Sequence, residues 1–260
     1  MKAAKNVGLN RMNQSQMAAW DSVYNPIIRQ FIKTDPKGQD LVRFKYQRYL
    51  QDYLACIAAV DKSVGKVLDY LKETGLDKNT IVIYASDQGF YLGEHGWFDK
   101  RFIFDESYRT PLLITWPGVT KAGSVNSDLV SNLDFAETML DMAGVDIPSD
   151  MQGESFVPIL KGNTPSTWRK EHYYHYYEYP AVHSVKRHYA ISTERYKLVH
   201  FYYDIDEWEL FDLQNDPLEL KNVYNDPLYV TVKEDLHKRL EILRIKYGDN
   251  DELTNSFLPN

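Results

Sequence analysis

The chain has few of the features that mark disulfide-rich or membrane-embedded proteins. Cys56 is its only cysteine, so no intramolecular disulfide can form and the redox compartment stays open. No apolar run approaches the roughly 20 residues that a membrane-spanning helix needs, so we expect no membrane span. Met1–Asn10 contains lysines without a following apolar stretch, and we expect no signal peptide in this chain.

Basic residues are also in the minority. The 30 Lys and Arg residues are outnumbered by 37 Asp and Glu residues, the formal net charge is -7, and no basic run occurs. This balance disfavours a nucleic-acid partner. What remains is an ordinary globular composition, since 260 residues of which 43% are hydrophobic can bury a sizeable core.

Apolar periodicity predicts an α/β arrangement in the first part of the chain. Helical spacing predicts a helix from Leu41 to Leu71, ended by Gly75. The β-branched run Ile81–Tyr84 indicates a fully buried parallel strand, and Leu112–Trp116 indicates a second strand. A further helix is expected over Leu133–Ala143.

Beyond Pro165 the sequence becomes dense in aromatic residues with the pattern of strands. We predict an antiparallel sheet of about four strands, closed by a helix that covers one face. These elements are expected at His172–Tyr179, His188–Ser192, Tyr196–Tyr203, Glu209–Leu213 and, for the helix, Tyr229–Tyr247. We therefore expect an α/β domain at residues 1–165 and a smaller subdomain at residues 166–260.

Two polar residues follow the first predicted strand at its carboxyl end. Asp87 and Gln88 would face the crevice in which open α/β sheets bind ligands. Carboxylate and amide oxygens suit calcium or magnesium rather than zinc, but calcium takes roughly six to eight oxygens and needs further ligands. The alternative is a turn that satisfies its own backbone.

Lys100 and His95 lie in the glycine-rich segment that follows. The compact ammonium of Lys100 could meet an anionic oxygen at the mouth of the site. His95 could donate or accept a proton, because histidine titrates near neutrality. The alternatives are a solvated lysine beside Arg101 and a histidine that makes surface hydrogen bonds.

The stretch Ser86–Gly118 resembles the second signature region of the type I sulfatases, which belong to the alkaline-phosphatase-like superfamily. It reads SDQGFYLGEHGWFDKRFIFDESYRTPLLITWPG, with acid, amide and glycine after a strand, then a lysine, then a strand that ends in Pro-Gly. Gly144–Gly162, Tyr196–Phe201 and Glu209–Val223 resemble later parts of the same family, in the same order.

This resemblance implies an α/β fold class. The first part would be a partial alkaline-phosphatase-like sandwich, with a mostly parallel sheet flanked by helices. A small antiparallel sheet subdomain with a terminal helix would follow. Carried over by position, the resemblance implies that Asp87 and Gln88 are calcium ligands and that Lys100 contacts the sulfate group. His95 would be a neighbour in the catalytic site.

The resemblance also places the carboxy-terminal subdomain beside the substrate. Among the four histidines from residue 172 to residue 188, His183 and His188 are the candidates for substrate binding. Trp97 in the site loop, and Trp208, are the aromatic residues best placed to stack on a sugar. The alternative is packing within an aromatic-rich sheet. Zinc is disfavoured, because the histidine spacing is irregular.

The family's nucleophile has no counterpart in these 260 residues. Type I sulfatases use a formylglycine made from Cys or Ser in a C-x-P-x-R or S-x-P-x-R motif, and no such motif occurs. Cys56, in YLACIAAV, is expected to be a small buried hydrophobic residue. The family's early Asp-Asp calcium ligands are also missing. We therefore expect the carboxy-terminal portion of a sulfatase, inactive alone, with an exposed apolar sheet that an amino-terminal sulfatase segment can cover.

These observations lead to a sulfuric ester hydrolase as the first hypothesis. FYLGEHGWFDKR and YYDIDEWELFDL look most like bacterial sulfatases that act on N-acetylglucosamine-6-sulfate in mucin or glycosaminoglycan. The sulfated glycan would be the substrate, and the complete parent would be periplasmic or secreted. The alternatives are a non-catalytic carbohydrate-binding or interaction protein derived from a sulfatase, and a phosphoester hydrolase of the same superfamily.

Overall fold

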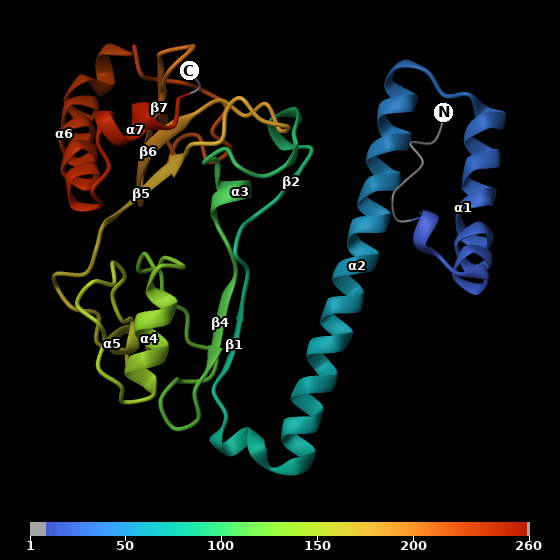
Figure 1. Ribbon diagram of the computed structural model, residues 1–260, viewed down its shortest axis with the longest axis horizontal. Helices are drawn as coiled ribbons and strands as arrows, with labels where there is room; N and C mark the ends of the chain where they lie inside the picture. The colour runs from blue at the N-terminus through green and yellow to red at the C-terminus, as the bar shows by residue number, and fades with distance from the viewer. Residues whose placement is uncertain (1–8, 259–260) are drawn as a thin grey trace. The chain divides into compact units, whose positions relative to one another are not determined.

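The structure, a computed structural model, describes residues 9–258 (Figure 1). Most of the segment considered for a signal peptide lies outside the described residues. Contacts divide the chain into two compact units, one that ends at Val67 and one that begins at Leu68. Because the division falls inside a long helix, each unit is described by itself.

The first unit is a helical hairpin. A short turn, η1 (Leu9–Arg11), precedes α1 (Gln14–Thr34), and α2 (Gly38–Thr74) follows and continues past the division. The Asn13 side chain accepts from the backbone of Gln16, whose own side chain accepts from the backbone of Asn13. This capping box fixes the start of α1.

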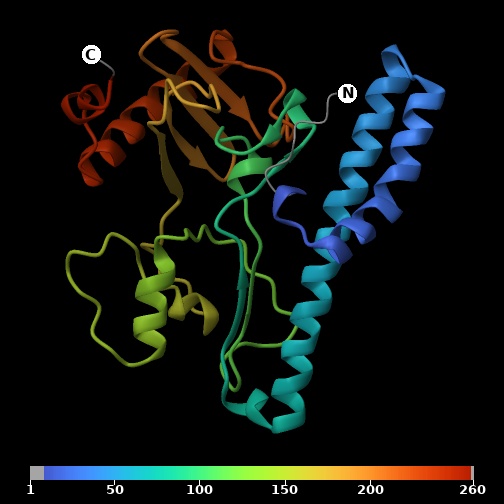
Figure 2. The same ribbon diagram turned by 45° about the vertical axis from the view of Figure 1, so that its right-hand side comes forward.

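Aromatic and polar contacts join α1 to the first part of α2. The rings of Phe31 and Phe44 lie 5.0 Å apart, and the Tyr24 hydroxyl donates to the Asp52 carboxylate at 3.2 Å. The two helices therefore run side by side, as Figures 1 and 2 show.

The long helix α2 confirms the predicted helix, and Gly75 follows it with a left-handed φ of 72°. None of its residues is buried within the described part of the chain, and Leu54 and Ile57 of its apolar stripe are 57% and 47% exposed. Cys56 is exposed too, so the expectation of a buried cysteine was wrong. The apolar stripe predicts the helix correctly, but its burial needs a partner surface.

The second unit begins with two short strands. β1 (Val82–Ala85) and β4 (Leu112–Thr115) confirm the predicted strands, but they pair with each other in antiparallel register, with Val82 opposite Thr115. The expectation of a fully buried parallel strand was therefore wrong, and Tyr84 is 39% exposed. The reason is that within residues 9–258 β4 is the only strand beside β1.

Short elements surround this strand pair. They are η2 (Leu76–Asn79), β2 (Tyr91–Leu92), η3 (Glu94–Gly96), β3 (Phe98–Asp99), α3 (Asp105–Tyr108), α4 (Asp134–Met142) and α5 (Val157–Leu160). β2 and β3 pair in antiparallel register. α4 confirms the helix predicted over Leu133–Ala143, and Gly144 follows it with a φ of 68°.

The carboxy-terminal part is a four-stranded antiparallel sheet with a terminal helix, as predicted. The strands run in the order β5-β6-β7-β8, and the helical elements follow them. Their bounds are β5 (Glu171–Tyr176), β6 (His188–Thr193), β7 (Tyr196–Phe201), β8 (Glu207–Asp212), η4 (Pro227–Tyr229), α6 (Val230–Lys246) and α7 (Asp251–Ser256). The mixed α/β fold class is confirmed. The expected boundary at residue 165 falls between α5 and β5 and stays a prediction.

Both faces of this sheet are covered. On one face Leu198 and Leu210 pack against Leu236 and Leu240 of α6. On the other face Ile103, which is 1% exposed, packs among sheet residues from the loop that leads into α3. Figure 2 shows the red terminal helices and the green segment with α3 on opposite sides of the sheet. The sheet therefore positions the loop that carries Lys100.

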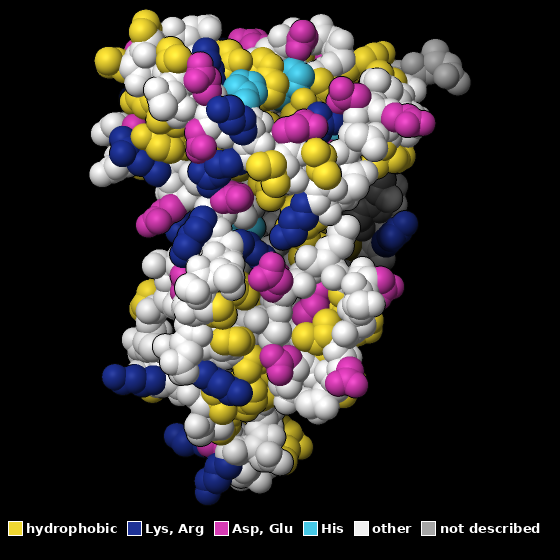
Figure 3. Space-filling view, turned by 90° about the vertical axis from the view of Figure 1, so that its left-hand side faces the viewer, with side chains coloured by type: hydrophobic (Ala, Val, Ile, Leu, Met, Phe, Trp, Pro, Cys, Tyr) yellow, Lys and Arg dark blue, Asp and Glu magenta, His cyan; other side chains and the backbone are white. Residues whose placement is uncertain are grey.

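Two features of the described residues bear on the expectations of no membrane span and no large patch of one charge. Within the described residues no helix is long and apolar enough to cross a membrane. On the face in Figure 3, Lys and Arg side chains are interspersed with Asp and Glu side chains. Such mixing leaves no extended field of one sign there.

Leu198→Ala tests the core between the sheet and α6. The Leu198 side chain is fully buried, so its truncation leaves a cavity. We expect the free energy of unfolding to fall by about 2–5 kcal/mol, measured by urea unfolding with circular dichroism. Leu228→Ala, at a side chain that is 88% exposed, is the control and should change it by less than about 0.5 kcal/mol. Equal losses in both variants would contradict this core.

Candidate functional site

A cavity of about 1030 Å³ in the second unit brings together three of the predicted site residues. Asp87, Gln88 and Lys100 all line it. The turn after β1, the loop that leads into α3, the segment between β4 and α4, and strand β5 form its wall. The site therefore lies at the end of β1 where Asp87 was expected.

The turn that presents Asp87 and Gln88 is held from behind. The Ser86 hydroxyl donates to the Gln88 carbonyl at 2.8 Å, and the Gly89 amide donates to the Ser107 carbonyl at 2.7 Å. A Cβ on Gly89 would lie 2.1 Å from the Glu106 carbonyl oxygen, so only glycine permits this approach. Neither of these hydrogen bonds uses the side chain of Asp87 or Gln88.

Neither Asp87 nor Lys100 has a side-chain hydrogen bond or ion pair within residues 9–258. Asp87 is exposed and Lys100 is half-buried. Lys100 is followed by Arg101, whose φ of 107° is strained for a side chain larger than glycine. An uncommitted carboxylate and an uncommitted ammonium on one cavity are suited to bind a cation and an anion together.

The donor set fits part of a calcium site. Asp87 and Gln88 supply hard oxygen ligands, which calcium prefers. Calcium takes roughly six to eight such ligands. In the part of the chain that the structure describes, no group of three or more His, Cys, Asp or Glu side chains is arranged to hold a metal. These residues can therefore contribute to a calcium site without completing one.

His95 lies outside the cavity lining. Its ring stacks on Phe104 at 4.3 Å, and its Nε2 lies 3.4 Å from a carboxylate oxygen of Glu106. The residue has a left-handed φ of 53°. Its environment is thus that of a packed ring with an acidic neighbour.

The exposed substrate candidates also lie outside the lining of this cavity. His183 is exposed, with Nδ1 3.3 Å from a carboxylate oxygen of Asp99, the residue before Lys100. Trp97 is 38% exposed and meets Phe102 edge to face at 4.9 Å. Trp208 instead stacks on His200 at 4.1 Å beside the core. His183 and Trp97 could reach a ligand, whereas Trp208 is used for packing.

His188 is placed in the interior of the sheet. Its side chain is 0% exposed, and its ring lies against Phe102, Tyr174 and Phe201. Burial lowers the pKa of His188 to about 4, although its contact with the Lys186 carbonyl opposes this. The ring of His188 is packed within the sheet and does not line the cavity, and its substrate role stays a prediction.

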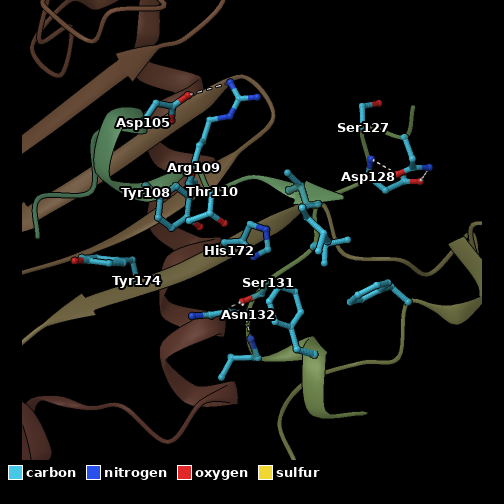
Figure 4. Close-up of a pocket in the computed structure, with 18 of the residues that line it drawn as sticks. Asp105, Tyr108, Arg109, Thr110, Ser127, Asp128, Ser131, Asn132, His172 and Tyr174 are labelled. Atoms are coloured by element: carbon cyan, nitrogen blue, oxygen red, sulfur yellow. Dashed lines mark hydrogen bonds and ion pairs between the residues drawn. The ribbon is translucent and has the colours of Figure 1, made fainter. Parts of the chain in front are cut away.

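His172 was not chosen from the sequence but lines the cavity from β5. Figure 4 shows it between Thr110 and Ser131, with Tyr174 on the same strand. Burial, and to a lesser degree the Arg169 guanidinium, lowers the pKa of His172 to about 4. A neutral imidazole can both donate and accept a hydrogen bond. Alternation along a strand places His172 and His175 on opposite faces of the sheet. Which of these faces meets the cavity depends on the pairing of β5 with β6.

Arg109 and a set of small polar residues were also missed. Arg109 is largely exposed and lies 3.5 Å from the Asp105 carboxylate, and Figure 4 shows the pair at the edge of the cavity. The polar lining from the segment before α4 comprises Ser124, Asn126, Ser127, Asp128, Ser131 and Asn132. No spacing rule marks such residues in a sequence.

The rest of the cavity wall is apolar. Leu112 and Ile114 of β4 face Phe135, Phe156 and Ile159 around α4 and α5. The cavity therefore has a polar half suited to a charged ligand and an apolar half continuous with a hydrophobic core cluster.

Two family models match this chain. The sulfatase model matches residues 14–145, and the model of the carboxy-terminal part of N-sulphoglucosamine sulphohydrolase matches residues 93–246. Together they cover the candidate site and the carboxy-terminal sheet.

Among the relatives, N-acetylglucosamine-6-O-sulfatase of Bacteroides thetaiotaomicron is 51% identical over 243 residues, 93% of this chain and 44% of its own length. The multifunctional alkaline phosphatase superfamily protein PehA of Trinickia caryophylli is 32% identical over 84% of this chain and 45% of its own length. The chain thus spans a little under half the length of these relatives.

The fold matches solved structures as well. That of BT4656 in complex with D-glucosamine-2-N,6-O-disulfate has a TM-score of 0.90 at 51% identity, over 94% of this chain and 50% of that chain. The structure of the phosphonate monoester hydrolase of Agrobacterium radiobacter has a TM-score of 0.66 at 30% identity, over 73% of this chain and 40% of that chain. The extracellular sulfatase SULF-1 homolog of Drosophila melanogaster is 42% identical over 41% of this chain and 10% of its own length.

The pKa of His172 predicts an acid-sensitive site. Its folded pKa lies below the ordinary value of 6.5, so the unfolded chain takes up the proton first as the pH falls. The corresponding stability is present above about pH 6.5 and is lost as the pH approaches 4. We expect NMR to find the imidazole neutral at pH 5.5, with the resonance assigned by His172→Gln. A midpoint near 6.5 would contradict the buried environment.

Proposed function

Because the chain belongs to the sulfatase family, we propose that it forms the part of a sulfuric ester hydrolase that binds calcium and the sulfate group. The observation that carries this proposal is the shared cavity of Asp87, Gln88 and Lys100. The first two supply uncommitted oxygens, and the third supplies an uncommitted positive charge. This combination suits an ester whose anionic end lies against a metal ion.

The proposed substrate is a sulfated carbohydrate, with N-acetylglucosamine-6-sulfate in glycosaminoglycan or mucin as the specific choice. Support comes from the name of the Bacteroides thetaiotaomicron relative and from the disulfated glucosamine bound in the BT4656 structure. Within the chain, His172, His183 and Trp97 are the side chains that we propose to contact the sugar. His172 offers a neutral hydrogen-bonding ring, and Trp97 offers an exposed apolar face.

The residues of this chain would act on the charge of the sulfate ester. Asp87 and Gln88 would hold calcium, which when bound neutralises negative charge on the sulfate oxygens. The Lys100 ammonium would contact one of these oxygens and stabilise the charge that develops there in the transition state. His95, with Glu106 beside Nε2, is proposed to act near the leaving oxygen as a proton donor. The formylglycine nucleophile would come from residues outside these 260.

The partner proposed to supply it is an amino-terminal sulfatase segment. Leu113 and Met139 are 64% and 50% exposed, which is costly for apolar side chains in water. A hollow of about 400 Å³ is lined by Ile81, Ile83, Met139, Met142 and Ala143. Within residues 9–258 the pair of β1 and β4 has no further strand beside it, and a sheet edge of this kind suits a further strand and its packed helix. The complete enzyme is proposed to be periplasmic or secreted.

Two other functions stay open to test. A phosphoester hydrolase has support from the likeness to the phosphonate monoester hydrolase of Agrobacterium radiobacter. A non-catalytic carbohydrate-binding protein would need only the aromatic and histidine side chains. A preference for phosphate esters over sulfate esters would favour the phosphoester hydrolase. Glycan binding that survives Asp87→Ala and Lys100→Ala would favour the non-catalytic carbohydrate-binding protein.

The 260-residue chain alone should have no measurable turnover of 6-O-sulfated N-acetylglucosamine. The covalent route needs the absent nucleophile, so the remaining binding groups have no group to activate. Sulfate release from the purified chain with excess calcium measures this. Robust, calcium-dependent release by a homogeneous preparation would overturn the assignment of a partial site.

Co-expression with the part of the Bacteroides thetaiotaomicron relative that this chain does not match should restore calcium-dependent sulfate release. In the restored enzyme we expect Lys100→Ala to lower kcat/KM by about 10²–10³-fold, because it removes charge stabilisation in the transition state. Lys238→Ala, at an exposed lysine of α6, is the matched control and should leave kcat/KM unchanged. Equal activity of the Lys100 variant would remove Lys100 from the sulfate site.

A further inference from the structure

A buried lysine attaches the loop that carries Lys100 to the carboxy-terminal sheet. Lys197 of β7 is 0% exposed. Its Nζ donates to the Ile103 carbonyl at 2.8 Å and lies 2.9 Å from Oδ1 of Asp105. Both acceptors belong to the segment that directly follows Lys100, so one side chain of the sheet fixes two points of this loop.

Glu219 completes the attachment from a separate part of the chain. Its Oε1 forms an ion pair with Lys197 Nζ at 2.7 Å, and its Oε2 accepts from the Asp105 amide at 2.7 Å. The Glu219 side chain is 1% exposed. Burial raises the pKa of Glu219, while Lys197 acts in the opposite direction. The carboxylate thus holds both the lysine and the loop backbone.

The backbone beside Lys100 is strained and held in place. Arg101 has a φ of 107°, which a side chain rarely adopts. Its amide donates to the Ser107 hydroxyl at 2.9 Å, and its carbonyl accepts from the Tyr174 hydroxyl. Such a conformation persists only where the surroundings over-determine it. The contacts of Lys197 and Glu219 with Ile103 and Asp105, two and four residues after Arg101, belong to these surroundings.

We propose that Lys197 and Glu219 are positioning residues for Lys100, which hold its loop at the distance and angle that the sulfate contact requires. The proposal rests on the proposed function for the role of Lys100, but not for the order of the loop. Neither residue lines the cavity, so they act through Ile103 and Asp105 rather than on the substrate.

A purely stabilising role explains these contacts less well. Replacing a buried ion pair by apolar residues of similar volume is often neutral or stabilising, so the pair is weak evidence for stability. Apolar residues could not, however, accept from the Asp105 amide or donate to the Ile103 carbonyl. The Lys197 ammonium and the Glu219 carboxylate are therefore better explained by the loop geometry that they hold than by stability.

The test measures loop order in the full chain. A nitroxide is placed at position 100 in a Cys56→Ser/Lys100→Cys background, since Cys56 is the only other thiol. Lys197→Met/Glu219→Gln then removes both buried charges together, which avoids leaving one of them unpaired. We expect the label to gain mobility in the electron paramagnetic resonance spectrum while the melting temperature stays close to that of the labelled parent.

Arg239→Met/Glu171→Gln is the matched control. This pair joins α6 to β5 at 2.6 Å and does not touch the loop, so it should leave the spectrum unchanged. An unchanged spectrum for the folded Lys197/Glu219 variant would overturn the proposal. Mobility gained only together with global unfolding, or equally in the control, would overturn it too.

The complemented enzyme separates this proposal from the proposed function. With Lys100 intact, Lys197→Met/Glu219→Gln should lower kcat/KM at least tenfold, because the loop that presents Lys100 is released from the sheet. If the label gains mobility but the complemented enzyme without the double substitution has no sulfatase activity, only the proposed function is refuted. Full activity in the double variant would refute the positioning role alone.

Discussion

The buried ammonium of Lys197 joins the carboxy-terminal sheet to the loop on the cavity. Taking an ion out of water costs several kcal/mol, and this cost is offset only by well-placed partners. Here two carboxylates and a carbonyl surround one side chain, and Ile103 is inserted beside it. Burial of such an apolar side chain contributes about 1.5–3 kcal/mol. The loop cannot separate from the sheet without leaving the buried Lys197 ammonium short of partners. The sheet and this part of the cavity wall are therefore held together.

Local patterns were enough to predict most elements. The helix α4, the strands β5 to β8 and the terminal helix follow from apolar spacing, and the turn of Asp87 and Gln88 follows from the strand before it. Pairing is different, because the partner of β1 is decided by residues about thirty positions away and by whichever strands are present to compete. The exposure of Cys56 and the burial of His188 likewise depend on surfaces that no local pattern contains.

The site shows the same division. Asp87, Gln88 and Lys100 were placed together from the resemblance, and they line one cavity. His172 could not be selected over its neighbours, because a strand of alternating aromatic residues offers two similar faces. The register of β5 with β6 and the loop with Ile103 decide which face meets the cavity. The apolar half of the wall is continuous with the hydrophobic core cluster around α4 and α5.

The strained backbone of Arg101 has an evolutionary consequence. Glycine would adopt this φ freely, and relief of such strain is worth about 1–3 kcal/mol. It would also loosen the residue that precedes it. Glycine would, however, also lose the ion pair that the Arg101 guanidinium makes with the Asp99 carboxylate. A substitution that relieves the strain at residue 101 is therefore not neutral in evolution, because it changes the backbone and an ion pair together.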